Sequence, residues 1–166
     1  VNLYEKSYHK SHFLRDVSKK LKLKTEVVQK NIFDPFEYLN LRDEEGLFNS
    51  KFKNTAGKIA YQTACHQRVQ NFGPKTKTIL SKIPGSEITM IERCSGHDGT
   101  YAIKLESFEK SLKIRKPVIS RIEKNNYKVF TSDCPMAAKH VGNALNRNNI
   151  KIELHPISIL KLAYEI

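Results

Sequence analysis

Tryptophan is absent from this 166-residue chain, and only three cysteines occur in it. So few thiols, in an odd number, do not suit the disulfide framework of a secreted protein, and we expect free thiols in a reducing, cytoplasmic setting. No apolar run approaches the roughly 20 residues of a membrane helix, so the sequence predicts no membrane span and leaves a peripheral association open. A signal-peptide pattern is also missing from the first residues.

Acidic residues are scarce as well. The chain has 29 Lys and Arg against 17 Asp and Glu, a formal net charge of +12. Such an excess suits a phosphate backbone, but the lysines are scattered, with one dense run at 19–24, and they are not interleaved with aromatic residues. Sequence-specific nucleic-acid recognition uses arginine forks and aromatic stacking. We therefore expect a solvated basic surface and no specific nucleic-acid partner.

Residues 57–166 alternate β-rich runs with helical patterns, which indicates an α/β domain. The length and a hydrophobic content of 39% suit one ordinary core. Each return to the same sheet edge needs a crossover, so the alternation predicts a small parallel sheet of three to four strands flanked by helices. The predicted strands are 58–64, 87–92, 127–131 and 151–154; the predicted helices are 75–82, 100–125 with a break near Pro117, 135–146 and 157–164.

Residues 1–56 are predicted to be an N-terminal helical connector or extension. Between residues 1 and 32, apolar side chains that include Val27 and Val28 fall at helical spacing, which predicts one or two amphipathic helices. Asp34 and Pro35 suit the N-cap and first position of a short helix, and Gly46 suits its end. The chain starts without an initiator Met, and we expect it to be part of a longer protein.

Each cysteine follows a predicted strand: Cys65 after 58–64, Cys94 after 87–92 and Cys134 after 127–131. The carboxyl ends of parallel strands share one edge of the sheet, where ligands bind. The sequence therefore predicts that three thiols, separated by 28 and 39 intervening residues, meet at one metal or redox site.

Three thiolates leave a tetrahedral zinc site or an ordinary four-iron cluster one ligand short. His66 directly follows Cys65 and is a candidate, although it could equally cap a helix or face solvent. His97 and Asp98 lie between two glycines and are candidates too; the alternative is a turn in which Asp98 caps the next helix. His140 is predicted on a helix surface and is a weaker candidate.

Cys134 has a further chemical distinction, because it precedes Pro135 at a predicted helix start. Unpaired backbone N–H groups and the helix dipole stabilise an anion there, which favours a thiolate. Arg68 and Arg93 lie near the other two thiols in sequence. An electropositive surround of this kind suits an anionic cluster and a reactive thiol alike, so both interpretations stay open.

Three short segments resemble one cysteine-rich CCG repeat: Cys65-His66, Cys94-Ser95-Gly96 and Cys134-Pro135-Met136-Ala137, followed by His155-Pro156. Such repeats occur in heterodisulfide reductase B subunits, in the iron–sulfur subunit of glycolate oxidase and in the C subunit of anaerobic glycerol-3-phosphate dehydrogenase. The resemblance covers residues 57–166. It implies a C-terminal repeat of an iron–sulfur oxidoreductase subunit, preceded upstream by a first repeat and a ferredoxin-like domain.

The same resemblance implies function and site residues. It implies electron transfer with a redox partner protein or dehydrogenase subunit, and an iron–sulfur cluster bound through Cys65, Cys94 and Cys134, with His97, His66 or Asp98 completing the shell. Two positions depart from the repeat: Ser95 stands where it has the second Cys of its Cys-Cys pair, and Ala137 where it has its last Cys, which leaves three cysteines of five. The alternative is a degenerate structural or partner-docking module, zinc-binding or metal-free, without redox activity.

Overall fold

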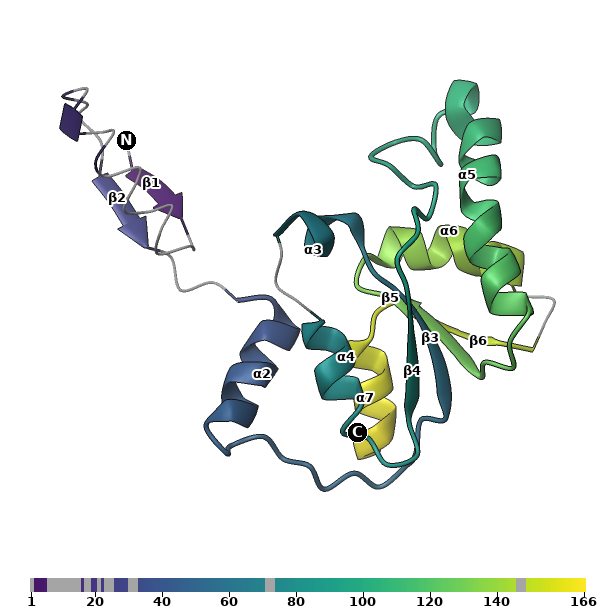
Figure 1. Ribbon diagram of the computed structural model, residues 1–166, viewed down its shortest axis with the longest axis horizontal. Coiled ribbons are helices and arrows are strands. Elements are labelled where there is room, and N and C mark those ends of the chain that lie inside the picture. Colours follow the sequence, from purple (N-terminus) through teal and green to yellow (C-terminus); the bar gives the residue numbers. More distant parts are fainter. Residues whose placement is uncertain are drawn as a thin grey trace. The chain divides into compact units, whose positions relative to one another are not determined.

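The computed structural model of the chain describes residues 2–5, 16, 19, 20, 22, 26–29, 33–70, 74–145 and 149–166 (Figure 1). The chain divides into two compact units, Val1–Tyr38 and Leu39–Ile166. The domain boundary expected between residues 56 and 57 stays a prediction. Within the described part of the chain, no helix combines the length and apolar character needed to cross a membrane.

The first unit contains two short strands, β1 (Asn2–Glu5) and β2 (Glu26–Gln29). They pair in parallel, with Asn2 opposite Glu26 and Glu5 opposite Gln29. The helical prediction is therefore wrong at Val27 and Val28, which belong to β2. Adjacent β-branched residues favour an extended backbone, and the few apolar residues of this segment made its helical spacing weak evidence.

Between residues 6 and 25, the helical prediction can be compared with the structure at a few described positions. Asp16, Lys19 and Lys20 are helical, and Lys22 is in a turn with a φ of +50°. The other residues of the predicted helices between 6 and 25 lie outside the described residues.

Helix α2 (Pro35–Glu44) begins and ends as its sequence predicts. The Phe36 N–H donates a hydrogen bond to Asp34 Oδ1 at 2.9 Å, so Asp34 is the N-cap. Gly46 follows the last turn with a φ of +71°, a left-handed conformation that glycine adopts at little cost.

The second unit is built on a four-stranded parallel sheet, which confirms the predicted fold class. Its spatial order is β4 (Glu87–Ile91), β3 (Lys58–Gln62), β5 (Val129–Ser132) and β6 (Lys151–Glu153). Strand β3 lies between β4 and β5, and Gln62 is the register partner of Ile91 on one side and of Ser132 on the other. Three strands therefore end side by side at one edge.

The connections between these strands are helical, as parallel pairing requires. Helices α3 (Cys65–Gln70) and α4 (Lys75–Leu80) link β3 to β4, α5 (Leu105–Glu123) links β4 to β5, and α6 (Pro135–Leu145) links β5 to β6. Helix α7 (Ile157–Tyr164) follows β6. Figure 1 shows α4 and α7 on one face of the sheet and α5 and α6 on the other. Helix α3 was not predicted from the sequence.

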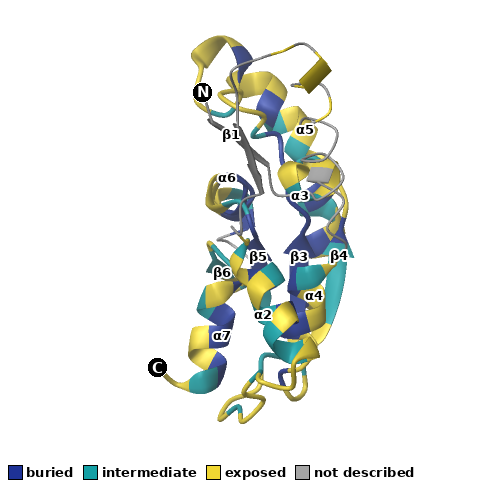
Figure 2. Cartoon of the chain, turned by 90° about the vertical axis from the view of Figure 1, so that its left-hand side faces the viewer, coloured by how far each residue is buried: buried dark blue, intermediate teal, exposed yellow. Residues whose placement is uncertain are grey.

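The core under α5 and α6 is a single cluster of buried apolar side chains. It contains Ala60, Ile91, Val118, Ile122, Tyr127, Phe130, Ala138, Val141 and Leu145. In Figure 2 the two central strands, β3 and β5, are mostly dark blue because they are buried, whereas β4 at the sheet's edge is mainly teal. Gly142 lets α6 approach β6 closely, because a Cβ atom there would lie 2.7 Å from Ile152 Cγ2. This packing fixes the start of α6, and with it Cys134, against the end of β5.

The predicted break near Pro117 does not occur, because α5 runs from Leu105 to Glu123 with Pro117 inside it. Proline removes one backbone donor from a helix. Pro117 and Lys113, four residues earlier, are both exposed, so water can satisfy the carbonyl that lost its partner. The next residue, Val118, is fully buried, and its packing holds the helix together across this position.

Candidate functional site at the carboxyl edge of the sheet

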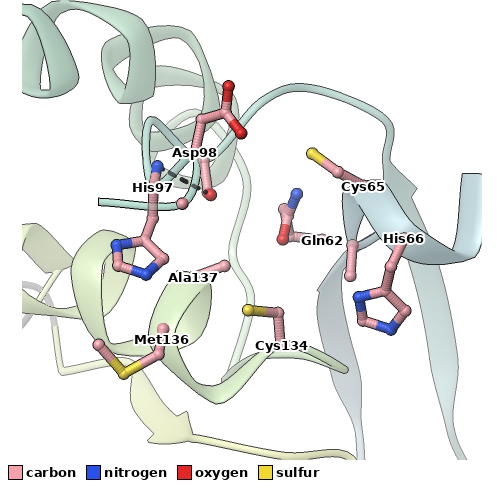
Figure 3. A pocket seen from close by; sticks show the side chains of 11 residues that line it. Gln62, Cys65, His66, His97, Asp98, Cys134, Met136 and Ala137 are labelled. Atoms are coloured by element: carbon pink, nitrogen blue, oxygen red, sulfur yellow. Dashed lines mark hydrogen bonds between the residues drawn. The ribbon is translucent and has the colours of Figure 1, made fainter. Parts of the chain in front are cut away.

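The loops that leave β3, β4 and β5 surround a pocket of about 310 Å³ at the carboxyl edge of the sheet (Figure 3). Five of the predicted site residues line it: Cys65, His66, His97, Asp98 and Cys134. In Figure 3, Cys65 and His97 lie on opposite sides of the pocket, with Cys134 and Gln62 between them. Met136 and Ala137, from the first turn of α6, complete one wall.

Gln62, which sequence reasoning missed, ties the three loops together. Its Nε2 donates to the Arg93 carbonyl oxygen at 2.9 Å, directly before Cys94. Its Oε1 accepts a hydrogen bond from Ser132 Oγ at 2.7 Å, and Ser132 Oγ accepts one from the Cys134 N–H at 3.3 Å. Gln62 is 1% exposed, and its bond with Ser132 is buried, whereas the bond to the Arg93 carbonyl is partly buried. A polar residue at a buried strand end was the available signal.

Cys65 is the first residue of α3 and its side chain is exposed. Its pKa is raised, first by partial burial and then by the neighbouring Cys94 thiol; Asp98 raises it further and Arg68 opposes the shift. The effect of Cys94 on the pKa of Cys65 indicates that the two thiols lie near each other, although they come from different loops.

Cys94 is half-buried, and the Gly96 N–H donates a hydrogen bond to its Sγ at 3.4 Å. Gly96 has a φ of +80°, and a Cβ atom at this position would overlap the Ser111 carbonyl oxygen of α5. The β4 loop can therefore take this path, and present its N–H to the sulfur, only with glycine at position 96.

Asp133, next to Cys134, is a second residue that the sequence analysis missed. It is 6% exposed, and its carboxylate accepts a hydrogen bond from Thr76 Oγ1 of α4 at 2.9 Å and another from the Tyr61 hydroxyl. The Tyr61 hydroxyl also lies 2.6 Å from Gln67 Oε1 of α3. Burial raises the pKa of Asp133, and the hydrogen bonds from Tyr61 and Thr76 oppose that rise. The network joins the Cys134 loop to α3 and α4.

The histidine predictions have mixed outcomes. His66 is exposed and lines the pocket beside Cys65. His97 is half-buried, with its ring centroid 6.4 Å from that of His140. His140 was predicted on a helix surface, but it is 7% exposed because α6 turns it toward α5, next to Phe108 and His97. Burial lowers the pKa of His140, with Arg115 adding to the effect.

Within the described ranges, no group of three or more His, Cys, Asp or Glu side chains is arranged to hold a metal ion. The strand order explains why the three thiols do not form one. Cys94 follows β4 and Cys134 follows β5, and β3 lies between these strands. Neighbouring strands lie about 4.8 Å apart, so the two ends are separated by about 10 Å before the loops bend. Cys65 follows the central strand, so it leaves the sheet between the other two cysteines.

The fold defines a small α/β domain in which three cysteines follow strands at the carboxyl edge of a parallel sheet. The chain is 30% identical over 107 residues to the C subunit of anaerobic glycerol-3-phosphate dehydrogenase from Escherichia coli K12, a match that covers 64% of this chain and 26% of the relative. The same protein of Escherichia coli O157:H7 matches equally. The chain is thus distantly related to this dehydrogenase subunit and spans about a quarter of its length.

A second relative is similar over a short segment. Ribosomal RNA small subunit methyltransferase G of Pelagibacter ubique is 71% identical over 34 residues, which are 20% of this chain and 16% of the relative. No protein-family model matches the chain, and no solved structure does.

Proposed function

We propose that this chain is a domain of an oxidoreductase subunit that takes part in electron transfer, and that Cys65, Cys94 and Cys134 form its functional site. The observation that carries the proposal is the gathering of these cysteines at one sheet edge in a chain 30% identical to a dehydrogenase subunit. The carboxyl edge of a parallel sheet is where such folds bind ligands. The partner would be a dehydrogenase subunit or another redox protein, in a reducing, cytoplasmic setting that keeps the thiols free.

The cofactor that the CCG resemblance implies is an iron–sulfur cluster. Thiolates are the ligands that such clusters prefer, and Cys65, Cys94 and Cys134 would supply three, with His97, His66 or Asp98 as the candidate further donor. As they lie, these side chains do not fit a preformed centre, since no described group of three is arranged to hold a metal. We therefore assign no step of electron transfer to a cluster.

The chain's own residues have a defined role in this proposal, which is to position the thiols. Gln62 holds the loops of Cys94 and Cys134 to the central strand, and Asp133 holds the Cys134 loop to α3 and α4. Both side chains are buried, so their hydrogen bonds keep the loops at fixed distances from Cys65. Their substitution should disturb the site without removing any thiol.

Metal content after anaerobic reconstitution tests the cofactor. Iron and acid-labile sulfide bound in equal amounts, with charge-transfer absorption, would support the cluster, and each of Cys65→Ser, Cys94→Ser and Cys134→Ser should then lower the iron content at least severalfold. The exposed Lys77→Ala of α4 is the control and should bind as much iron as the unmodified chain. A folded, colourless and iron-free protein would contradict the cluster.

A degenerate structural or partner-docking module is the second candidate, and a specific observation favours it. Ser95 and Ala137, which replace two thiols of the CCG pattern, are both 3% exposed and packed at the site. The Ser95 hydroxyl and the Ala137 methyl group are poor iron ligands, so these two residues do not take over the role of the thiols that the CCG pattern has at their positions. One zinc ion per chain, or no metal with an intact fold, would support this interpretation, and iron with sulfide would contradict it.

A further inference from the structure

Cys65 and Cys94 occupy matching positions on neighbouring strands. Gln62 of β3 and Ile91 of β4 are register partners, and each cysteine is the third residue after its strand's partner. The Thr63 N–H donates to the Ile91 carbonyl oxygen at 3.2 Å, so the segment after β3 stays hydrogen-bonded to β4 one residue beyond the end of β3. The two cysteines thus leave the sheet side by side.

The spacing of such neighbours suits a disulfide. Adjacent strands lie about 4.8 Å apart, and the Cα atoms of disulfide-bonded cysteines lie about 4.4–6.8 Å apart. The Gln62 hydrogen bond to the Arg93 carbonyl oxygen holds the residue before Cys94 against β3, so the second loop does not swing away from the first.

Cys134 does not share this relationship. It follows β5, which lies on the other side of β3. Ser132 is the register partner of Gln62, and Cys134 comes two residues after Ser132, so it is level with Ala64 and not with Cys65. Cys94 and Cys134 have a whole strand between them. The site therefore consists of one matched pair of thiols and a third thiol on the opposite side of the central strand.

We infer that Cys65 and Cys94 form a reversible intramolecular disulfide, which makes the pair a two-electron redox couple of the chain itself. This inference needs no metal and does not rest on the electron-transfer proposal. The oxidant is a small disulfide, RS–SR. Cys65 and Cys94 together lose two electrons and two protons, one S–S bond forms between them, and RS–SR is reduced to two RSH.

The exposure of the two sulfurs sets the order of the exchange. Cys65 is exposed, so its thiolate attacks RS–SR first, which forms a Cys65–S–S–R bond and releases RSH. The Cys94 sulfur then attacks the Cys65 sulfur and expels the second RSH. The Gly96 N–H that donates to Cys94 Sγ stabilises negative charge on the attacking sulfur. A small dithiol reverses both steps.

Thiol trapping of the full 166-residue chain tests the inference. After incubation with oxidised glutathione, alkylation under denaturing conditions should modify one of the three cysteines, and the intact mass should show the loss of two hydrogens. Proteolysis without reduction should yield a Cys65 peptide linked to a Cys94 peptide. A reducing agent should restore three alkylated cysteines. Cys134→Ser is the matched control and should still form the disulfide, whereas Cys65→Ser and Cys94→Ser should not.

The outcomes separate this inference from the proposed function. Three alkylated cysteines after oxidation, or a linkage that includes Cys134, would overturn the Cys65–Cys94 pair even if the chain binds iron. A Cys65–Cys94 linkage in a chain that takes up no iron would support the pair while contradicting the cluster. The peptide linkage in the unmodified chain decides the result if a serine variant does not fold.

Discussion

Gln62 Oε1 accepts a hydrogen bond from Ser132 Oγ at 2.7 Å, and this contact joins the central strand to the loop that carries Cys134. Both residues are buried, so the bond has no competition from water. Because the same Gln62 side chain binds the Arg93 carbonyl oxygen, one amide group sets the positions of two cysteine loops. The geometry of the thiol site therefore depends on a residue that is not a thiol.

Ser132→Ala should destabilise the protein and loosen the Cys134 loop. The substitution leaves Gln62 Oε1 buried without its donor and removes the acceptor of the Cys134 N–H. An unsatisfied buried polar group costs about 1–3 kcal/mol, which urea unfolding would detect. Alkylation of Cys134 in the native protein should become faster. The exposed Ser81→Ala is the control, with an expected change of about 0.5 kcal/mol or less.

Asp133→Asn should become more stable relative to the unmodified protein as the pH rises. The folded-state pKa of Asp133 is raised above its value in the unfolded chain, mainly by burial, so the folded state holds the proton more tightly. Folding stability from this group is therefore present at low pH and is lost as the pH rises through the raised pKa. Asparagine does not titrate and avoids that loss.

The measurement is the free energy of unfolding of both proteins in urea, from about pH 4, near the usual aspartate pKa, up to neutrality. The difference between Asp133→Asn and the unmodified chain should shift steadily in favour of the variant. A difference that is constant with pH, or that shifts the other way, would contradict the direction assigned to the pKa of Asp133.

Gly96→Ala should be more destabilising than Gly99→Ala, although both glycines have a positive φ. The left-handed conformation costs alanine about 1–2 kcal/mol at either position. At Gly96 the new Cβ would also overlap the Ser111 carbonyl oxygen, while at Gly99 nothing lies within 4 Å of it. Thermal unfolding should therefore give a lower midpoint for Gly96→Ala. Equal midpoints would show that the β4 loop does not need its close approach to α5.

Gly142→Ala should destabilise the contact between α6 and β6, because the added Cβ would lie 2.7 Å from Ile152 Cγ2. Overpacking of this kind costs about 1–3 kcal/mol. The double variant with Ile152→Ala should be less unstable than the sum of the two single variants, since the second substitution removes the clashing methyl group. Additive losses in urea unfolding would place the strain elsewhere.

Local sequence predicted most of the second unit, and the failures have physical causes. The alternation of strands and helices and the start of α2 at Pro35 are confirmed. The break at Pro117 was wrong, because tertiary packing around Val118 outweighs one lost backbone hydrogen bond on an exposed side. The helical prediction at Val27 and Val28 was wrong, because strand pairing between distant segments is not visible in local periodicity.

The sequence by itself determined that Cys65, Cys94 and Cys134 each follow a strand, since β-rich runs and their ends are local features. Only the tertiary structure decided which of them are neighbours. The spatial order β4-β3-β5-β6 depends on how the crossover helices pack on the sheet, and this order puts Cys65 between the other two thiols. Side-chain packing across the sheet, which no local pattern encodes, therefore decides that Cys94 and Cys134 lie on opposite sides of the strand that leads to Cys65.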